Sequence, residues 1–384
     1  MKLLITSTVR HAALTEDSGW IYEVDTDAWR VVRMCPMPPP MYREFDNNQR
    51  GGLRGGKGLI VEEDRVWIAN ASHIYSFDRQ WNCVARFSHP SCAMIHDIAL
   101  HGDDLWATST RNDLLVRFDR AGRVTGYFDF RRFPEISKDI GLPQLTAWNE
   151  EALLRGDTDF RDPRTHVLEE TNRTHINSVC FLAGGDMIVS MGRITPERMK
   201  RLWHVKQWLK GRGLWPWVVK ISQLMTRFTG MKSARHSNLV MVPGSYDTVL
   251  LRVSGDGACH IWKRWRNVMV PMHSLRTLPD GHVLYNNTDS GEVLKLDEAT
   301  GEILQQVFVD SAFLRGNDAV SDEHLVVGSQ NQLFEMNLRD GRTTRSLLLN
   351  EDARSSIFAV AALPDGMAPL PERLYVDAEQ EGGS

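Results

Sequence analysis

Three histidines that each open a short apolar segment are the first candidates for chemistry in this sequence. His96 begins HDIALHGDDLWATS, His175 begins HINSVCFLAGGDMIVS and His273 begins HSLRTLPDGHVLYNN. Asn177 follows His175 by two residues, at a place where an apolar strand needs no amide. An imidazole can donate a hydrogen bond, attack an electrophile or bind a metal ion. Three of them at one position of a repeated segment therefore predict a functional site.

Three cations belong to the same predicted positions. Lys57 opens the segment KGLIVEEDRVWIAN, and Arg315 stands one residue ahead of GNDAVSDEHLVVGS. Arg193 ends the second strand of the hairpin that His175 begins, and the antiparallel return brings it back beside His175. A guanidinium can hold an oxyanion with two hydrogen bonds, while imidazole and amide groups donate to the remaining oxygens. We expect a small anionic substrate to be bound by His175, Asn177, Arg193, Lys57 and Arg315.

The elements that must position these residues repeat along the chain. Five segments share an inner apolar strand, a polar turn with Gly or Asp and a second apolar strand, and most continue into a third and a fourth strand. Units of four strands at a spacing of about forty residues are typical of β-propellers. The five segments begin at Lys57, His96, His175, His273 and Gly316.

A sixth copy of the repeat is divided between the two ends of the chain. FAVAALPDG from Phe358 supplies one inner strand, and KLLITST, GWIYEVD and WRVVRMC near residue 1 supply the other three. We therefore predict an all-β fold, a six-bladed β-propeller closed by strand exchange between the N- and C-terminal segments. The propeller is expected to form one domain over residues 1–366, with a tail over 367–384. Closure removes the free sheet edges that promote aggregation.

Two long connections interrupt the repeats at one end of the ring. Residues 131–174 join the third and fourth blades, and residues 194–247 separate the second and third strands of blade four. In an up-and-down blade, both connections lie on the face where the inner strands begin. Loops longer than about fifteen residues are usually lids or binding segments. We expect both insertions, together with the Pro-rich stretch before Lys57, to cover the channel mouth that the histidines surround.

The insertion within blade four is basic and rich in tryptophan. Residues 197–235 contain ten Lys or Arg, one acidic residue and four Trp. Their apolar residues keep helical spacing on both sides of a GRG and WPW break, which predicts two amphipathic helices. The apolar faces could pack on the propeller as a helical cap within 194–247. Alternatively, the basic faces could make a peripheral contact with an anionic membrane.

Composition limits the class of protein. The chain has 384 residues, 42% of them hydrophobic, and a net charge of −4, so it lacks the basic signature of nucleic-acid binding. It contains no apolar run of about eighteen residues, and its first apolar segment is too short for a secretory signal. Five scattered cysteines without a CxxC pair indicate neither disulfides nor a zinc ribbon. We expect a cytoplasmic protein with no nucleic-acid partner.

Parts of the sequence resemble the aryl-sulfate sulfotransferases, a family of six-bladed propellers. The resemblance covers roughly residues 90–300 and rests on HINSV with Arg193 eighteen residues after His175, on the HD pair at His96 and on MHSLRTLPDGHVLYNN. In that family a His-x-Asn motif, a later Arg and two further His bind sulfate, and one His is transiently sulfurylated. HSLRTLPDG, LKLDEATGE and FLRGNDAV also resemble a group of uncharacterised bacterial propellers. By the first resemblance, the sulfate site would consist of His96, His175, Asn177, Arg193 and His273.

Three functions follow as alternatives. In the first, which the resemblance implies, His273 attacks the sulfur of an aryl sulfate, and His96 protonates the leaving phenol and then activates the acceptor. This reaction needs no cofactor. In the second, His96, His175 and His273 bind a divalent metal that keeps an open coordination position. In the third, the channel is a non-catalytic site for a ligand or a protein.

Overall fold

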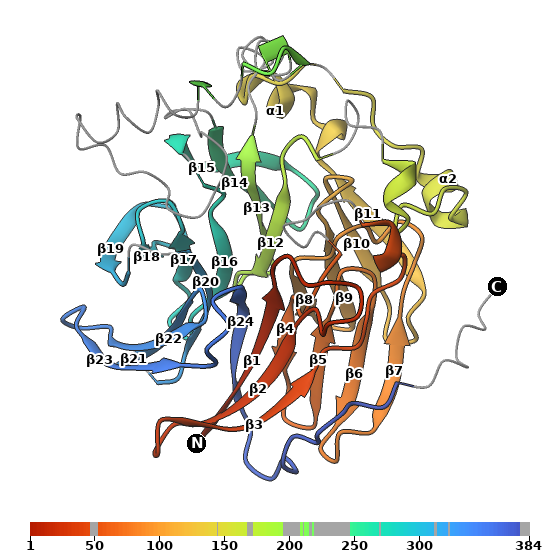
Figure 1. Ribbon diagram of the computed structural model, residues 1–384. Coiled ribbons are helices and arrows are strands. Elements are labelled where there is room, and N and C mark those ends of the chain that lie inside the picture. Colours follow the sequence, from red (N-terminus) through yellow and green to blue (C-terminus); the bar gives the residue numbers. More distant parts are fainter. Residues whose placement is uncertain are drawn as a thin grey trace.

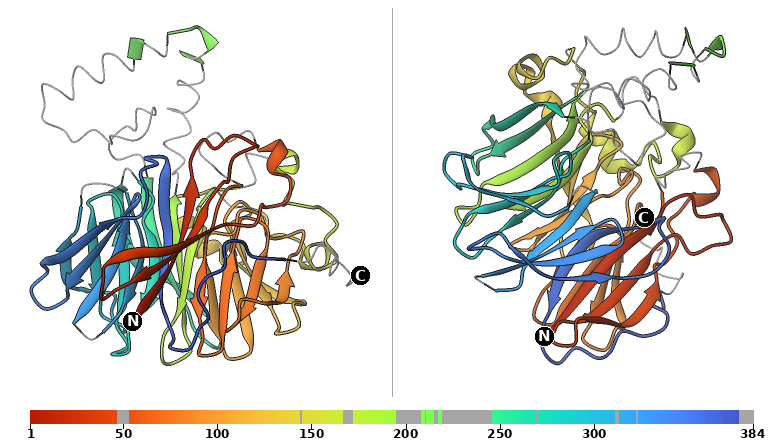
Figure 2. Two further views of the ribbon diagram at one scale, coloured as in Figure 1. Left: turned by 60° about the horizontal axis from the view of Figure 1, so that its bottom comes forward. Right: turned by 60° about the vertical axis from the view of Figure 1, so that its left-hand side comes forward.

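Six four-stranded antiparallel sheets form a ring, so the chain folds as a six-bladed β-propeller (Figure 1). The prediction of the fold class is confirmed. Two further views show the sheets from the side, packed next to one another around the ring (Figure 2). The inner strands of neighbouring blades contact one another around the ring. The computed structural model describes residues 1–46, 53–143, 145–166, 172–194, 208–209, 211–214, 217–218, 246–268, 270–310, 313–321 and 323–376.

Blades one to three are built from strands of three to nine residues, each paired with the next in the blade. Blade one consists of β24 (Ser355–Leu363), β1 (Lys2–Val9), β2 (Trp20–Asp25) and β3 (Arg30–Pro36). Blade two consists of β4 (Leu59–Val61), β5 (Arg65–Ala69), β6 (Ile74–Asp78) and β7 (Cys83–Phe87). Blade three consists of β8 (Ile98–His101), β9 (Asp104–Ser109), β10 (Leu114–Phe118) and β11 (Val124–Asp129).

Blades four to six follow the same order from the channel outward. Blade four consists of β12 (Ile176–Phe181), β13 (Met187–Ile194), β14 (Tyr246–Val253) and β15 (Cys259–Val268). Blade five consists of β16 (His273–Thr277), β17 (Val283–Asn287), β18 (Glu292–Leu296) and β19 (Ile303–Phe308). Blade six consists of β20 (Leu314–Ala319), β21 (His324–Ser329), β22 (Gln332–Asn337) and β23 (Thr343–Leu348).

The few helical elements are short and lie in the connections between strands. In α2 (Glu150–Arg155), Asn149 caps the first turn by accepting a hydrogen bond from Ala152 N at 3.0 Å. Gly156 ends this helix with φ 67°, a left-handed conformation that glycine adopts without strain. The others are η1 (Arg43–Phe45), η2 (Phe130–Arg132), α1 (Pro134–Asp139) and η3 (Pro163–Thr165).

Strand exchange between the two ends of the chain closes the ring, as the sequence predicts. β24 pairs antiparallel with β1, with Lys2 opposite Leu363 and Val9 opposite Ser355. β24 therefore provides the inner strand of blade one, and the N-terminal segment provides the other three. The pairing leaves β1 with a neighbour on each side, so that β1 has no free edge.

The core lies between the faces of neighbouring blades. The inner strands β12 and β24 are almost wholly buried, whereas the outermost strand β23 alternates between exposed and half-buried residues. Between blades three and four, for example, Leu115 packs in one cluster with Ile176 and Val189. Burial of these apolar faces holds the blades against one another, since each fully buried aliphatic side chain contributes about 1.5–3 kcal/mol.

The segment after residue 366, expected as a tail, packs against blades one and two. Leu370 is fully buried, Leu374 nearly so, and both join the apolar cluster of these blades. Trp81 Nε1 donates to Ala368 O at 2.8 Å, and Leu370 N donates to Glu23 at 2.7 Å. Up to residue 376 the segment is thus part of the packed domain, and the rest of the expected tail, 377–384, lies outside the described residues.

Most of the predicted helical insertion lies outside the described residues. Within it, the described Trp208 and Trp217 are 54% and 66% exposed, and Arg212 Cζ lies 4.7 Å from the ring of Trp208. No helix among the described residues is long and apolar enough to span a membrane. The alternatives of a cap and of a peripheral membrane contact through 197–235 both stay predictions.

Candidate functional site

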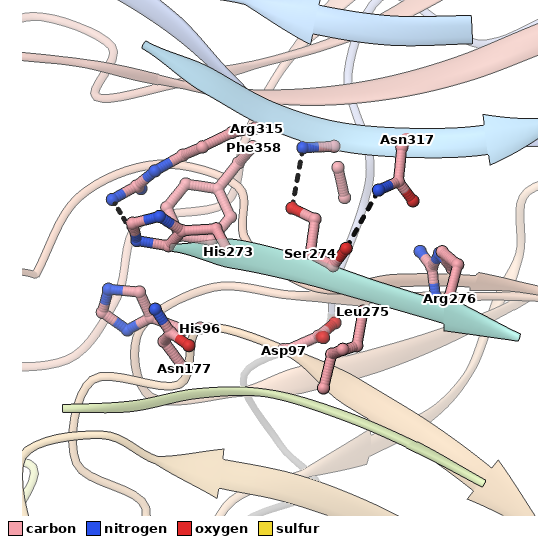
Figure 3. A pocket seen from close by; sticks show the side chains of 12 residues that line it. His96, Asp97, Asn177, His273, Ser274, Leu275, Arg276, Arg315, Asn317 and Phe358 are labelled. Atoms are coloured by element: carbon pink, nitrogen blue, oxygen red, sulfur yellow. Dashed lines mark hydrogen bonds between the residues drawn. The ribbon is translucent and has the colours of Figure 1, made fainter. Parts of the chain in front are cut away.

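The inner strands bring the predicted site residues together at one end of the channel. Phe358 lies among them: its ring is 4.2 Å from Lys57 Nζ, 5.3 Å from the ring of His96 and 4.4 Å from Arg315 Cζ. Figure 3 shows His96, His273, Arg315 and Phe358 gathered at the start of β16. Residues from blades one, two, three, five and six thus surround one small space.

The three histidines form a row within this group. The ring of His175 lies 5.0 Å from that of His96 and 6.4 Å from that of His273, edge-on in both cases. His96 and His273 are buried, whereas His175 is half-buried. The alignment of inner strands from the sequence therefore placed the three imidazoles correctly beside one another.

Two of the three imidazoles have their proton position set by local acceptors. His96 Nδ1 lies 2.9 Å from Met94 O, a carbonyl that can only accept, so Nδ1 carries the proton. His175 Nδ1 lies 3.0 Å from Asn172 Oδ1, which favours the same tautomer. In the neutral rings, Nε2 of His96 and of His175 therefore keeps its lone pair and can act as acceptor, base or nucleophile.

His273 differs, because both of its ring nitrogens are engaged. Arg315 Nη2 donates to His273 Nε2 at 2.9 Å, so the lone pair of Nε2 is occupied. Nδ1 then carries the proton and donates to Thr288 Oγ1 at 3.2 Å, which itself donates to Leu314 O at 3.0 Å. This geometry does not suit the nucleophilic role expected of His273. It makes His273 the residue that orients Arg315.

β-bulges recur in the inner strands close to these residues. The ladder pairing skips Asn177 in β12, Ser274 in β16, Gly316 in β20 and Phe358 in β24. A bulge leaves one residue unpaired and bends the strand, which changes the direction of nearby side chains. Ser274 and Gly316 have φ of 64° and 68°, so part of this geometry is left-handed. The site is thus built where four of the inner strands depart from regular pairing.

The cations of the site lack carboxylate partners within the described part of the chain. Lys57 is 3% exposed, and among the described residues no carboxylate pairs with Lys57, Arg193 or Arg315. Arg315 Nε and Arg193 Nε are buried without a hydrogen-bond acceptor in this part of the chain. Burial, assisted by Arg315, lowers the pKa of Lys57 well below its usual 10.5, and burial likewise lowers the pKa of Arg315. The arrangement concentrates uncompensated positive charge.

Burial and these cations also keep the histidines neutral. Burial lowers the pKa of His96 and His273 well below 6.5, and Lys57 and Arg315 respectively lower it further. For His175, burial again acts first and Arg193 second. At neutral pH the imidazoles are therefore uncharged. A negative charge that enters the site would raise the pKa of each imidazole and so favour its protonation.

Arg193 returns beside His175 as the antiparallel hairpin predicts. Its backbone N donates to Thr174 O at 3.1 Å, and its Cζ lies 5.5 Å from the ring of Tyr246. Arg111, which the sequence analysis did not identify, joins it: burial and the charge of Arg193 lower the pKa of Arg111. Arg111 stands in the turn between β9 and β10, and no repeat pattern marks it as a site residue.

Asp113, which was also not predicted, holds the backbone of Thr174 and His175 in place. Its Oδ1 accepts hydrogen bonds from Thr174 N at 3.0 Å and His175 N at 2.8 Å. Arg131 pairs with the same carboxylate at 3.7 Å. Asp113 adopts φ 55°, a left-handed conformation that Asp tolerates in turns. It fixes the backbone of His175 although 62 residues separate the two.

The Asn177 amide nitrogen is engaged by the protein backbone, whereas we expected it to donate to an anion. Asn177 Nδ2 donates to Met272 O at 2.7 Å, which fixes the orientation of the amide. Its Oδ1 is buried and receives no hydrogen bond among the described residues. Gly192 makes room for it, because a Cβ at residue 192 would lie 2.2 Å from Asn177 Nδ2 and 2.9 Å from Met272 O.

Gly192→Ala is expected to displace Asn177 and to destabilise the fold by roughly 1–3 kcal/mol, the usual cost of overpacking. Gly184→Ala is the matched control, because a Cβ at residue 184, in the turn between β12 and β13, meets nothing within 4 Å. That control should change stability by less than about 0.5 kcal/mol. Chemical unfolding of both variants provides the comparison, and equal stabilities would contradict the close packing around Asn177.

The cavity enclosed by these residues is small. It measures about 20 Å³, enough for one water-sized group, so the bulk of any larger ligand would have to lie outside it toward the mouth. Figure 3 shows the side chains that line it. The labelled side chains among them include His96, Asp97, Asn177, His273, Arg276, Arg315, Asn317 and Phe358.

The three histidines do not form an evident metal site. Among the described residues, no group of three His, Cys, Asp or Glu side chains is placed to share one ion. His273 would first have to release Arg315 from Nε2, and its Nδ1 faces Thr288. The tri-histidine arrangement that the sequence left open is therefore not favoured by the geometry.

Comparisons with known proteins indicate the fold alone. No protein-family profile and no curated protein sequence matches the chain. A protein of unknown function from Bacteroides caccae is similar in structure with TM-score 0.50 and 9% identity, over 94% of this chain and 97% of that one. Virginiamycin B lyase from Staphylococcus aureus follows with TM-score 0.47 and 9% identity, over 92% and 90%. None of these similarities supports the resemblance to aryl-sulfate sulfotransferases beyond the propeller itself.

Proposed function

We propose that the channel mouth binds a small oxyanion. One observation carries the proposal: buried Lys57 and half-buried Arg315 both lie against the ring of Phe358, and neither has a carboxylate partner among the described residues. A buried cation without a counter-charge costs several kcal/mol. A bound oxyanion would offset this cost for both cations at once, and Arg315 can donate from more than one nitrogen.

Neighbouring groups add to the positive potential of the proposed site. Arg193 and Arg111 lie beside His175. The charge of Arg193 lowers the pKa of His175 and also that of Arg111. His96 and His175 can become donors through Nε2 by taking up a proton. Binding of an oxyanion would then be coupled to proton uptake, because a negative charge raises the pKa of every adjacent base.

Sulfate and phosphate are therefore expected to raise the melting temperature, whereas chloride at equal ionic strength is not. A ligand present at ten times its dissociation constant stabilises the folded state by about 1.4 kcal/mol. Differential scanning calorimetry at several anion concentrations would measure the effect, and isothermal titration would give the affinity. If neither oxyanion changed the melting temperature relative to chloride, the oxyanion proposal would be wrong.

Group transfer from an aryl sulfate is a second candidate, favoured by the state of His96. Its Nδ1 proton is held by Met94 O and its Nε2 lone pair is available in the cavity, as an imidazole nucleophile requires. In this proposal His96 Nε2 forms the bond to sulfur while the bond from sulfur to the phenolate oxygen breaks. An acceptor hydroxyl then displaces the imidazole from sulfur and gives its proton to the neutral Nε2 of His175, and the released phenolate takes up a proton from solvent to become phenol. Arg315, oriented by His273, holds the sulfuryl oxygens.

Transfer predicts a phenol product and a labile sulfuryl adduct on His96 after exposure to 4-nitrophenyl sulfate. His96→Ala should abolish phenol release, and His273→Asn should slow it on the order of a hundredfold through loss of Arg315 orientation. Intact-mass analysis and phenol absorbance would measure both. An adduct that mapped to His273 would reverse the proposed roles. Sulfate binding without phenol release would leave a non-catalytic anion site.

A further inference from the structure

Two arginines beside His175 form a second group of cations at the mouth. The backbone N of Arg193 donates to Thr174 O at 3.1 Å, and Asn172 N donates to Arg111 O at 2.7 Å. Asn172 Oδ1 in turn lies 3.0 Å from His175 Nδ1. The backbone of both arginines is therefore fixed to the short segment that carries His175. We call these two arginines, Arg111 and Arg193, the second pair.

No protein group compensates the guanidinium groups of the second pair. Both side chains are half-buried, and both Nε atoms are buried without an acceptor. Among the described residues, no hydrogen bond or ion pair joins either guanidinium to the protein, and Arg193 only faces the ring of Tyr246 at 5.5 Å. A guanidinium carries five N–H donors, so each arginine keeps donors for a ligand.

The charges of the second pair act on one another and on His175. Burial lowers the pKa of Arg111, and the charge of Arg193 lowers it further. Burial also lowers the pKa of His175, and among the charges that lower it further, Arg193 has the largest effect and Arg111 contributes. Because interactions between charges weaken with distance, the two guanidinium groups occupy the same part of the mouth.

The two carboxylates that favour the charged form of Arg111 are bound by other cations. They are Asp113 and Asp46. Arg131 pairs with Asp113 at 3.7 Å, and Arg54 lies 3.9 Å from Asp46. Within the described ranges, neither carboxylate forms an ion pair with the second pair. An anionic group of a ligand can therefore take the place of a counter-charge there.

A row of rings links the second pair to the first pair, which is Lys57 and Arg315. The two cations of the first pair lie 4.2 Å and 4.4 Å from the ring of Phe358. The ring of His96 is 5.3 Å from that of Phe358 and 5.0 Å from that of His175. One small oxyanion held against Phe358 would occupy the first pair, and the arginines beside His175 would still need an acceptor.

We propose that the natural ligand is a small dianion, in which a short spacer joins two oxyanionic groups. The inference rests on the proposed oxyanion site and names its ligand class. The first pair holds one oxyanionic group, and the second pair holds the other through charge-assisted hydrogen bonds. The cavity of about 20 Å³ admits only one water-sized group and is not lined by the second pair. The spacer and the second anionic group therefore lie in the mouth outside it.

The test compares sulfonates that carry one and two anionic groups on the same alkane. Methanedisulfonate, ethane-1,2-disulfonate and propane-1,3-disulfonate would be titrated by calorimetry at pH 7 against methane-, ethane- and propanesulfonate. An ionic strength of about 0.15 M screens attraction beyond about 8 Å. The two equivalent ends of a disulfonate alone give about a twofold gain, whereas simultaneous contact with both pairs should give about tenfold or more for at least one spacer length.

Two variants assign the gain to the second pair. In Arg193→Gln and in Arg111→Gln, the ratio of disulfonate to monosulfonate affinity should fall toward about two, because the second anionic group loses a guanidinium partner. Either variant suffices if the other does not fold, which thermal unfolding without ligand would show. Arg117→Gln is the control, because it removes the same charge from the blade that carries Arg111, at a residue that pairs with Asp104 at 3.7 Å. It should keep the wild-type ratio.

The outcomes separate this inference from the oxyanion site on which it rests. Binding of sulfate together with a ratio of about two or less for every spacer would overturn the dianion and leave the oxyanion site intact. Failure of sulfate and of all sulfonates to bind would overturn both proposals. A large ratio that persisted in Arg193→Gln and in Arg111→Gln would show that the second pair does not hold the second anionic group.

Discussion

A chain that ends at Arg354 is expected to lose the closed ring and to aggregate. β24 pairs with β1 over its full length, so the deletion leaves the edge of β1 open to other chains. At about 1.5–3 kcal/mol for each large apolar side chain, the lost burial is comparable with the whole stability of a domain, about 5–15 kcal/mol. The buried apolar side chains concerned are Ile357, Phe358, Val360 and Leu363.

Two longer chains serve as controls for this deletion. A chain that ends at Asp365 keeps β24 but loses Leu370 and Leu374, which pack against blades one and two. It should unfold cooperatively at a lower temperature. A chain that ends at Val376 should match the full-length protein. Size-exclusion chromatography and thermal unfolding would distinguish the three, and a monomeric, cooperatively unfolding chain ending at Arg354 would contradict closure by β24.

The propeller could be predicted from the sequence because its signal is repeated. Each blade shows the same alternation of apolar residues and polar turns, and the split sixth copy is recognisable once the period is known. Alignment of the inner strands also placed His96, His175 and His273 together, since equivalent positions of a closed ring face one channel. Periodicity therefore predicted the fold and also that these three side chains lie near one another.

The roles of the site residues could not be predicted in the same way. Whether His273 keeps a free lone pair depends on Arg315 of the next blade, and the direction of the Asn177 amide depends on Met272 O. Both contacts join neighbouring blades, and the β-bulges that create them leave no mark in the apolar pattern. Arg111 and Asp113 were not predicted because they lie in a turn, where no repeat constrains the residue type.

Arg315→Met is expected to raise the free energy of unfolding and to lower the affinity for sulfate. Without ligand, the variant should be more stable than the wild type, because it replaces a half-buried cation with an apolar side chain of similar length. The Nε of this cation is buried without an acceptor, and no carboxylate of the described residues pairs with it. Sulfate affinity should fall on the order of a hundredfold, since truncation of one partner of a buried ion pair costs about 2–5 kcal/mol or more. Lys57→Met should act in the same directions.

The pH dependence of stability and of sulfate affinity provides a second test of the oxyanion site. In the folded chain, the pKa of His96, His175 and His273 lies well below 6.5. The unfolded chain therefore binds more protons below about pH 6.5, and stability should fall as the pH falls through that range. A bound oxyanion raises these pKa values. Sulfate should consequently protect the protein most at acid pH, and its affinity should decrease as the pH rises.

Arg252→Met is the control for the loss of a half-buried arginine that lies outside the site. Arg252 pairs with Asp186 at 2.7 Å, at the end of blade four away from the site, so its loss should lower stability slightly and leave sulfate affinity unchanged. Titration calorimetry in buffers of different ionisation enthalpy would report the protons taken up with sulfate in each variant. Loss of stability in Arg315→Met together with unchanged sulfate affinity would mean that Arg315 supports the ring and binds no anion. Increased stability with weakened, proton-linked binding is the combination that a cation held ready for an oxyanion requires.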